Sequence, residues 1–330
     1  MPALIPSSIC VYVGLDLVGD GLMKLPFLRA LRAAWPDARV TWLAGKGRTV
    51  FAHDLAPLAQ GLIDEVVEDA GIGSHWLELL RRPLAGRRFD LVIDTQRRVL
   101  TSLIVKRIAH GVFVSGAAGF MLSDRRPPVV GAKPRSMVRQ MLTLIETAAG
   151  APARPEAPLR LDAASMDAAR RLLPDRPAYI GLAPGAGGRH KCWPLNRFID
   201  LAQRIAKSGR VPVFILGPGE EEWSDLCRTV PGARLVLQDA AAQGIAVTPM
   251  LTIAVARRFA AAVANDSGAG HMLAAADIPL VSLFGPTQPE KFAPMTKRLT
   301  VLRAQDFGGA AMDAIPLEAV ERALNRIAAI

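Results

Sequence analysis

Short apolar runs alternate with helical patterns along nearly the whole chain. The runs are rich in β-branched residues and apolar at consecutive positions, which is typical of parallel strands covered by helices on both faces. In the first half of the chain, this pattern predicts strands at Ile9–Leu15, Arg39–Ala44, Asp64–Glu68, Asp90–Thr95 and Gly111–Gly116.

Helical segments are predicted between these strands, for example over Gly21–Trp35 and His75–Leu84. The alternation of strand and helix implies right-handed crossovers and a doubly wound sheet. The pattern stops at Gly150–Pro158, where three prolines occur in nine residues without any period. We interpret this segment as a linker between two domains.

The same alternation resumes beyond the linker. It predicts strands at Ala178–Ala183, Val211–Leu216, Phe259–Asp266 and Pro279–Phe284. An amphipathic helix is predicted after the first of them, because apolar residues recur with helical spacing at Leu195, Phe198, Ile199, Ala202, Ile205 and Ala206. A last helix carries one apolar stripe, formed by Leu317, Val320, Leu324 and Ile327.

The fold class predicted from these patterns is α/β, with two similar doubly wound domains at residues 1–152 and 153–330. We expect them to face each other across a cleft, with ligands at the carboxyl ends of the strands. The last helix is expected to complete the second domain or to pack back on the first. The length of 330 residues agrees, because single cores stop growing at roughly 250–300 residues.

Composition excludes several other classes of protein. Three cysteines without C-x-x-C spacing argue against a disulfide framework and a thiolate zinc site, and they suit a reducing cytosol. The chain begins without a basic residue before its first apolar stretch, unlike a secretory leader. No uncharged apolar run approaches the roughly 20 residues of a membrane-spanning helix. We therefore expect a soluble, cytoplasmic protein.

The net charge of +10 is shared between residues 1–150 (+6) and 151–330 (+4), but in the first half the basic side chains are clustered. Such clusters favour an anionic partner, either nucleic acid, acidic lipid headgroups or a phosphorylated substrate, but a solvated arginine-rich surface is an equal alternative. Nucleic acid is the weaker choice, because only 5% of the residues are aromatic. The clustered side chains are Arg81, Arg82, Arg87, Arg88, Arg97, Arg98, Lys106, Arg107, Arg125, Arg126, Lys133, Arg135 and Arg139.

The glycine-rich segment Pro184–Pro194 is the strongest local motif, because it leaves a buried strand and enters the amphipathic helix. Backbone N–H groups approach a ligand closely at glycines, and a helix start adds partial positive charge. Two cations, Arg189 and Lys191, favour an anion such as a diphosphate. The alternative is an ordinary strand-to-helix turn with Pro194 at the first helical position. The glycines concerned are Gly185, Gly187 and Gly188.

A second strand-to-helix loop runs from Asn265 to His271. Asp266 is suited to accept hydrogen bonds from hydroxyl groups, and Ser267 and Gly268 to offer backbone donors to a phosphate. His271 is a further candidate donor. The alternative is that Asp266 or Ser267 simply caps the helix.

Two further loops carry candidate carboxylates. After the first strand, Asp20 is placed to take a proton from a substrate hydroxyl as a general base, with Asp16 as its competitor and helix capping as the alternative. In Gly217–Trp223, a glutamate is suited to hold a ribose diol. There the alternative, acids that complement a helix dipole, is the stronger one.

Several functions lack their motifs. No G-x-G-x-x-G follows the first strand, and no G-x-x-x-x-G-K-[ST] is present, which argues against a nicotinamide dehydrogenase and a P-loop NTPase. The five histidines include no helical i, i+4 pair that would suit a metal, and no G-x-S-x-G nucleophile elbow occurs. We expect neither a cofactor nor a metal.

Taken in order, these segments resemble glycosyltransferase family 9, the ADP-heptose:lipopolysaccharide heptosyltransferase family. Its opening G-D, leucine-rich helix, P-x-A and W-L run is similar to Leu17–Ala44, and its glycine loop with K-x-W-P to Ile180–Phe198. Its N-D-S-G-x-x-H and F-G-P-T run is similar to Val263–Pro289. Met312–Pro316 also fits the family pattern before the last helix.

The resemblance implies a GT-B fold of two Rossmann-like domains, with the acceptor on the first and the nucleotide-sugar on the second. It implies inverting transfer of a sugar, heptose first of all, from a nucleotide-diphosphate donor such as ADP-heptose to a glycolipid acceptor of the lipopolysaccharide core or a related surface glycan. Such an enzyme is expected in the cytoplasm, with peripheral contact at the inner face of the inner membrane.

Residue roles follow from the same resemblance. By motif position, Asp20 matches the catalytic base, Lys191 the lysine that contacts the diphosphate, and Asp266 the residue that binds the donor's sugar hydroxyls. Ser267 and Gly268 match its phosphate contacts, and Glu221 or Glu222 falls near its ribose-binding glutamate.

The chain departs from the family pattern in two places. Gly14 stands where many relatives carry Arg or Lys, and Ala269 and Gly270 replace a bulkier pair before the histidine. Because of these departures, the transferred sugar need not be heptose. Two alternatives stay open: a sugar-nucleotide epimerase of the same GT-B fold, and a non-catalytic protein that binds sugar nucleotides, which only the Gly14 departure supports.

Overall fold

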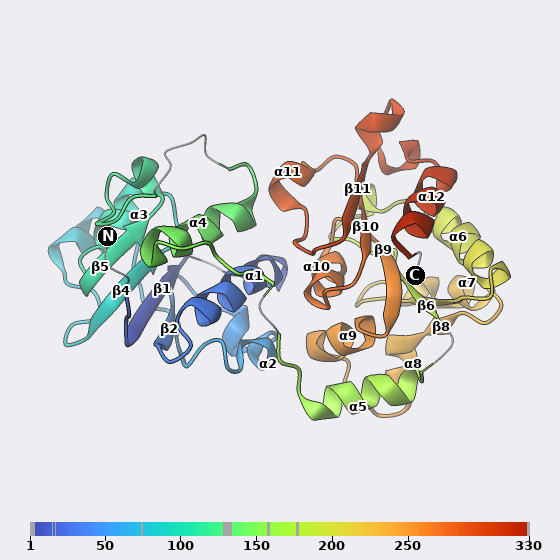
Figure 1. Cartoon of the computed structure of the whole chain (residues 1–330), viewed down its shortest axis with the longest axis horizontal. Coiled ribbons are helices and arrows are strands. Elements are labelled where there is room, and N and C mark those ends of the chain that lie inside the picture. The colour runs from blue at the N-terminus through green and yellow to red at the C-terminus, as the bar shows by residue number, and fades with distance from the viewer. Residues whose placement is uncertain are drawn as a thin grey trace. The chain divides into compact units, whose positions relative to one another are not determined.

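The computed structural model describes residues 4–14, 16, 18–73, 75–127, 134–156, 159–175 and 178–328. Contacts divide the chain into two units, Met1–Pro158 and Leu159–Ile330, each built on its own parallel sheet (Figure 1). The division falls at the end of the proline-rich segment, after Pro158, whereas we placed the boundary after residue 152. Leu15, Leu17 and Lys133, which belong to the segments considered above, lie outside the described residues.

The first unit contains a five-stranded parallel sheet in the order β3-β2-β1-β4-β5. All five predicted strands are present, with ends that differ by at most two residues. Because the order reverses at β1, the loops after β1 and β4 leave the same sheet edge side by side. The strands are β1 Ser8–Val13, β2 Arg39–Ala44, β3 Glu65–Val67, β4 Arg88–Asp94 and β5 Ala109–Ser115.

Helices cover this sheet, and the long helix α1 packs against α4. The predicted helix at His75–Leu84 is wrong in extent, because only a 3₁₀ turn forms there, η2 at Trp76–Leu80. Pro83 disfavours helical backbone at the residue before it, and Arg81 is already extended. The other helical elements are α1 Val18–Ala34, η1 Val50–Ala52, α2 Ala56–Ala59, α3 Val99–Val105, η3 Ala117–Phe120 and α4 Met137–Ala149.

The second unit contains a six-stranded parallel sheet in the order β11-β10-β9-β6-β7-β8. The four predicted strands are present, and the predicted architecture of two doubly wound, Rossmann-like sheets is confirmed. The two outer strands, β8 and β11, were not predicted, because one is only two residues long and the other is half-buried. The strands are β6 Tyr179–Ala183, β7 Val211–Phe214, β8 Arg234–Leu235, β9 Phe259–Asn265, β10 Leu280–Phe284 and β11 Leu299–Arg303.

The amphipathic helix α6 forms as predicted, at Leu195–Lys207, and buries Phe198, Leu201 and Ile205. The last helix, α12 at Leu317–Ala328, packs on β9, β10 and α6 within the second unit. The remaining helical elements are α5 Ala163–Leu172, η4 Arg189–Lys191, η5 Glu221–Trp223, α7 Ser224–Arg228, α8 Val236–Ala242, α9 Pro249–Ala256, α10 Gly268–Ala275, α11 Pro289–Phe292, η6 Ala304–Phe307 and η7 Met312–Ala314.

Among the described residues, no helix has both the length and the apolar character needed to cross a bilayer. The most apolar one, α9, is a buried helix of eight residues.

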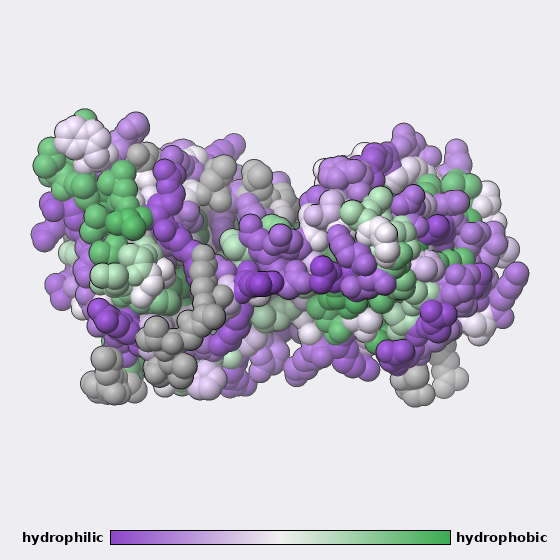
Figure 2. Space-filling view, turned by 90° about the horizontal axis from the view of Figure 1, so that it is seen from above, coloured by the Kyte–Doolittle hydropathy of each residue, from purple (hydrophilic) through white to green (hydrophobic). Residues whose placement is uncertain are grey.

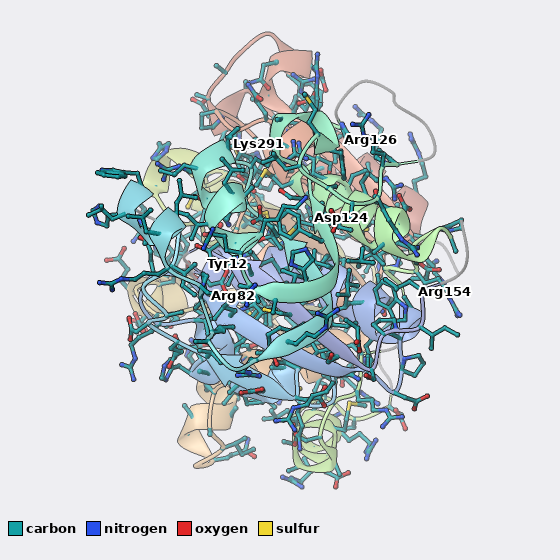
Figure 3. The ribbon with its side chains drawn as sticks, turned by 90° about the vertical axis from the view of Figure 1, so that its left-hand side faces the viewer. Tyr12, Arg82, Asp124, Arg126, Arg154 and Lys291 are labelled. Carbon is teal, nitrogen blue, oxygen red and sulfur yellow. The ribbon has the colours of Figure 1, made fainter. Side chains whose placement is uncertain are left out.

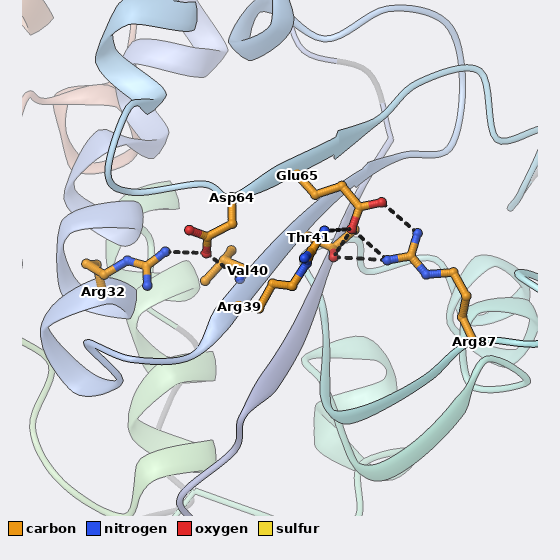
Figure 4. Close-up of polar contacts among 7 residues, drawn as sticks. All are labelled: Arg32, Arg39, Val40, Thr41, Asp64, Glu65 and Arg87. Carbon is orange, nitrogen blue, oxygen red and sulfur yellow. Dashed lines mark hydrogen bonds and ion pairs between the residues drawn. The ribbon is translucent and has the colours of Figure 1, made fainter.

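Polar side chains fix the edge of the first sheet, where β3 joins β2 (Figure 4). Asp64 accepts hydrogen bonds from the backbone N–H of Val40 and from Arg32, both at 2.7 Å. Glu65 is paired with the Arg87 guanidinium at 2.7 Å. Partial burial raises the pKa of Asp64, but the bonds from Val40 and Arg32 outweigh it and hold that pKa below its ordinary value.

Replacing Asp64 by asparagine should lower the free energy of unfolding at pH 7. The Asp64 side chain is 41% exposed, so solvent screens the lost charge and we expect a loss of about 1 kcal/mol. Because the folded pKa is depressed, this contribution is present above the unfolded pKa of about 3.9 and disappears as the pH falls through the folded value. Urea unfolding at neutral and acid pH measures it.

Asp167→Asn is the matched control, because Asp167 pairs with Arg170 on the surface with both side chains more than half exposed. It should change the unfolding free energy little at either pH. A loss in Asp64→Asn that stayed constant from pH 7 into the acid range would contradict the assigned ionic contribution.

Candidate functional site

The two predicted ligand loops of the second unit leave adjacent strands. The glycine-rich loop follows β6 and the Asn265–His271 loop follows β9, and β6 pairs with β9 in parallel register from Ile180 to Ala183. The carboxyl ends of parallel neighbours meet at one sheet edge. The structure therefore brings these two loops together at that edge.

Asn265, the last residue of β9, ties the two loops to each other. Its side chain is fully buried, donates to the carbonyl of Pro184 at 2.6 Å and accepts from the backbone N–H of Trp193 at 3.1 Å. Trp193 is held in turn, because its indole N–H donates to the Ile315 carbonyl at 2.9 Å. Sequence reasoning did not assign this role to Asn265, although an amide at the end of an apolar strand was a usable signal.

Lys191 lies in the loop between Pro184 and Trp193, the two residues that Asn265 holds, and its side chain comes close to Asp266. The Lys191 Nζ lies 3.8 Å from the Asp266 Oδ2, with the side chains 31% and 11% exposed. This distance is loose for an ion pair, and both groups have access to solvent. A cation and a hydroxyl-accepting carboxylate thus stand next to each other at the edge where β6 and β9 end.

At the start of α10, the side chains of Ser267 and Asp266 have different roles. Ser267 is the N-cap, and its Oγ accepts from the backbone N–H of Gly270 at 3.2 Å. The capping alternative is therefore correct for the Ser267 side chain, while the Asp266 carboxylate remains available to a ligand. Gly270, one of the departures from the family pattern, has a packing reason, since a Cβ there would lie 3.0 Å from the Asn265 carbonyl oxygen.

His271 is the fourth residue of α10. Burial lowers its pKa to about 4, and the neighbouring Asp266 only partly opposes that shift. The imidazole is therefore neutral near pH 7. It is able to donate one hydrogen bond but does not add positive charge to the site.

Of the three glutamates that follow Gly219, Glu220 faces the glycine-rich loop, whereas the predicted ribose contact was Glu221 or Glu222. A Cβ at Gly185 would lie 1.6 Å from the Glu220 Oε1, so the Glu220 carboxylate packs directly against this glycine. Glu220 accepts from the Gly217 N–H at 2.7 Å, and burial raises its pKa. Glu221 is exposed and accepts from the Gly219 N–H at 2.8 Å, while exposed Glu222 pairs with Arg189.

Residues 186–191 of the glycine-rich loop are less buried than Gly185. Gly187 has nothing within 4 Å of an added Cβ, and Gly188 lies against the exposed His190 ring. Arg189 stacks over Trp223 at 4.2 Å and points to Glu222. Pro194 is the N-cap of α6, with extended ψ, rather than its first helical residue.

In the first unit, Asp20 and Asp16 have different environments. Asp16 is buried, accepts from Trp42 Nε1 at 3.1 Å and from Thr49 Oγ1 at 2.8 Å, and pairs with Lys24. Asp20 lies in the first turn of α1 and is partly exposed, and within the described residues its side chain has no hydrogen bond or ion pair. Of the two carboxylates, Asp20 is the one free to meet a substrate.

Lys24 follows Asp20 by one helical turn of α1, on the same face. Burial lowers the pKa of Lys24 to about 7, while the Asp16 carboxylate beside it favours the charged form. Sequence reasoning missed this buried pair. Because Asp16 also accepts a hydrogen bond from Trp42 on β2, the pair ties α1 to that strand.

Polar groups also follow β4 at the same sheet edge. A Cβ at Gly14 would lie 3.1 Å from the Gln96 Oε1, so the Gln96 side chain packs against this glycine. Arg97 lies along Gly116, and burial lowers its pKa. Arg98 is exposed. No cluster of three or more metal-ligating side chains occurs in the described ranges.

The chain as a whole is similar to known proteins. The model of "Glycosyltransferase family 9 (heptosyltransferase)" matches residues 77–313. Lipopolysaccharide heptosyltransferase 1 of Escherichia coli K12 is 27% identical over 87% of this chain and 91% of its own length. Lipopolysaccharide heptosyltransferase 2 of Salmonella typhimurium is 32% identical, but the match spans 40% of this chain and only 38% of that protein.

The fold is also found among solved structures. That of the E. coli heptosyltransferase WaaC with ADP superimposes with a TM-score of 0.65 at 22% identity, covering 96% of this chain and 98% of that one. At this level of identity the likeness concerns the fold.

Replacing Asn265 by alanine should loosen both ligand loops of the second unit. The Pro184 carbonyl and the Trp193 N–H would lose their partners inside the protein, at about 1–3 kcal/mol for each buried group. We expect faster hydrogen exchange of the amides in residues 184–194. Asn196→Ala, at an exposed position on α6, is the control. Unchanged exchange in the loop of the Asn265 variant would show that the tether does not hold it.

Proposed function

The chain belongs to glycosyltransferase family 9, the heptosyltransferase family, and on this premise we propose that it transfers heptose from ADP-heptose to a lipopolysaccharide-core acceptor with inversion at the anomeric carbon. The observation that carries the proposal is the meeting of Lys191 and Asp266 at the ends of adjacent strands. A nucleotide-diphosphate sugar needs both a cation for its diphosphate and an acceptor for its sugar hydroxyls.

In this proposal the second unit binds the donor. Lys191 neutralises the diphosphate, and the backbone N–H groups at Ser267 and Gly268, where α10 begins, add partial positive charge. Asp266 holds the sugar hydroxyls, and neutral His271 offers a hydrogen bond. Close backbone approach occurs along the glycine-rich loop, at Gly185, Gly187 and Gly188.

We assign the ribose to Glu220 in place of Glu221, because Glu220 faces Gly185 while Glu221 points to solvent. The WaaC structure that contains ADP supports an adenine nucleotide. Ribose hydroxyls donate hydrogen bonds, and a half-buried carboxylate beside a glycine backbone is a suitable acceptor.

The first unit supplies the base. The Asp20 carboxylate takes the proton from the acceptor hydroxyl as its oxygen bonds to the anomeric carbon, while the bond from that carbon to the phosphate oxygen breaks and ADP leaves. Charge builds up on the leaving diphosphate, and Lys191 with the α10 helix start is placed to stabilise it. One displacement with one base predicts inversion.

The acceptor is assigned to the same edge of the first sheet. Exposed Arg98 and partly buried Arg97 follow β4, which pairs with β1 next to the Asp20 helix. Guanidinium groups suit the phosphates of a lipopolysaccharide core. A glycolipid acceptor of this kind implies work in the cytoplasm, at the inner face of the inner membrane.

Two substitutions should separate the two roles. Asp20→Asn should lower kcat by at least about 10²-fold while the Kd for ADP stays unchanged, because a general base contributes roughly 10²–10⁴. Lys191→Ala should raise the Kd for ADP by about 10- to 100-fold, the value of one charge-assisted hydrogen bond. Turnover with ADP-heptose and a core acceptor, together with calorimetry of ADP, measures both.

Asp37→Asn and Lys207→Ala, at exposed positions in the same units, are the controls. Full turnover in Asp20→Asn would remove the base assignment, and an unchanged Kd in Lys191→Ala would remove the diphosphate site. Epimerised sugar formed from the donor without acceptor would favour the epimerase alternative instead. ADP binding with no turnover on any acceptor would favour the non-catalytic one.

A further inference from the structure

Exposed apolar side chains are gathered at one end of the first unit. The described residues include ten exposed large hydrophobic side chains, and six of them belong to η2, α3 and the end of η3. Figure 2 shows hydrophobic colouring at the left-hand end, where α3 lies in Figure 1. Such a gathering, unlike scattered single residues, marks an interaction surface. We name it the apolar patch: Trp76, Leu77, Leu80, Val99, Leu103 and Met121.

These segments form one fixed surface. Both η2 and η3 contact α3. The Arg107 Nε donates to the Arg81 carbonyl at 3.0 Å, and the Lys106 Nζ to the Leu122 carbonyl at 2.7 Å. In each segment a neighbouring leucine packs into the core while the patch residues point outward, and these inner leucines are Leu79, Leu100 and Leu122.

A basic pocket adjoins the patch. It has a volume of about 270 Å³ and lies within the first unit. Arg82 comes two residues after Leu80, and Arg107 comes four residues after Leu103, just beyond the end of α3, so the chain runs from η2 and from α3 into the pocket. Figure 3 looks onto this end of the unit and labels Arg82. The pocket is lined by Arg82, Arg88, Lys106, Arg107, Ile108, Ala109 and His110.

The pocket keeps an excess of positive charge. Asp124 pairs with Lys106 at 2.9 Å and lies 3.5 Å from His110. For Arg82, Arg88 and Arg107, the described part of the chain supplies no carboxylate partner. Four basic side chains thus line the pocket, and among the described residues only Lys106 of these four is paired with a carboxylate, so the pocket attracts anions.

We propose that this end of the first unit docks on an anionic phospholipid bilayer, with the apolar patch inserted at the headgroup boundary and a lipid phosphate in the basic pocket. Protruding Leu, Met and Trp side chains beside arginines suit such an interface, where apolar burial and attraction to anionic lipid add together. Nucleic acid would use the arginines but leave the apolar patch exposed. The proposal rests on the proposed function only in that a glycolipid acceptor is held in a membrane.

Co-sedimentation with vesicles tests the surface without donor or acceptor. The wild type should bind vesicles of phosphatidylcholine with about one third phosphatidylglycerol, less at high salt, and bind pure phosphatidylcholine weakly. Arg82→Gln with Arg88→Gln should weaken binding roughly 25-fold, since each basic residue near an anionic leaflet contributes about a factor of five. Leu77→Ser with Leu80→Ser should weaken it by about tenfold or more.

The controls are matched pairs of exposed residues in the second unit, Arg171→Gln with Arg228→Gln and Leu226→Ser with Val247→Ser. They should bind vesicles as the wild type does. All variants should keep the wild-type melting temperature and Kd for ADP, which separates failure of the surface from failure of the proposed function.

Three results would overturn the proposal. One is equal binding of the wild type to neutral and anionic vesicles, or no binding to either. Another is retained vesicle binding by both test variants. The third is a different occupant of the basic pocket. If that occupant is a free anion, inorganic phosphate will displace the protein from vesicles more strongly than chloride at equal ionic strength. If it is nucleic acid, the protein will bind single-stranded RNA but not vesicles.

Discussion

The proposed donor site depends on one constraint, the pairing of β6 with β9, to which the buried Asn265 side chain adds a link between the two loops. Neither loop alone combines a cation with a hydroxyl acceptor. The strand pairing brings the loop ends together, and one buried amide bonds to the backbone of the glycine-rich loop at both of its ends. Lys191 and Asp266 are consequently positioned before any ligand binds, so less ordering is required at binding.

In the first unit, an ion pair and hydrogen bonds distinguish two nearby carboxylates. Two carboxylates follow β1, and only one has partners of its own. Asp16 is enclosed by Trp42, Thr49 and Lys24, which fixes the start of α1, while Asp20 in the next turn is left without a partner among the described residues. A base needs this arrangement, because a carboxylate already satisfied by hydrogen bonds is a poor proton acceptor.

The sequence predicted the central strands and the motif residues but not the contacts that distinguish near neighbours. Apolar runs at Ile9–Leu15 and Phe259–Asp266 carry their own signal, whereas the two-residue strand β8 exists only because β7 lies beside it. Likewise, Glu220 and Glu221 are equivalent in the sequence, and only the fold shows which one fills the space at Gly185. The bonds of Asn265 span more than 70 residues, beyond what local pattern encodes.

In the proposed mechanism, one carboxylate for the acceptor and a cationic site for the leaving diphosphate allow a single displacement, with no covalent sugar-enzyme intermediate. The anomeric configuration of the product tests this claim most directly. Nuclear magnetic resonance of the transferred sugar, compared with that of the donor, should show the opposite configuration at the anomeric carbon. A product with the donor's own configuration would contradict the account.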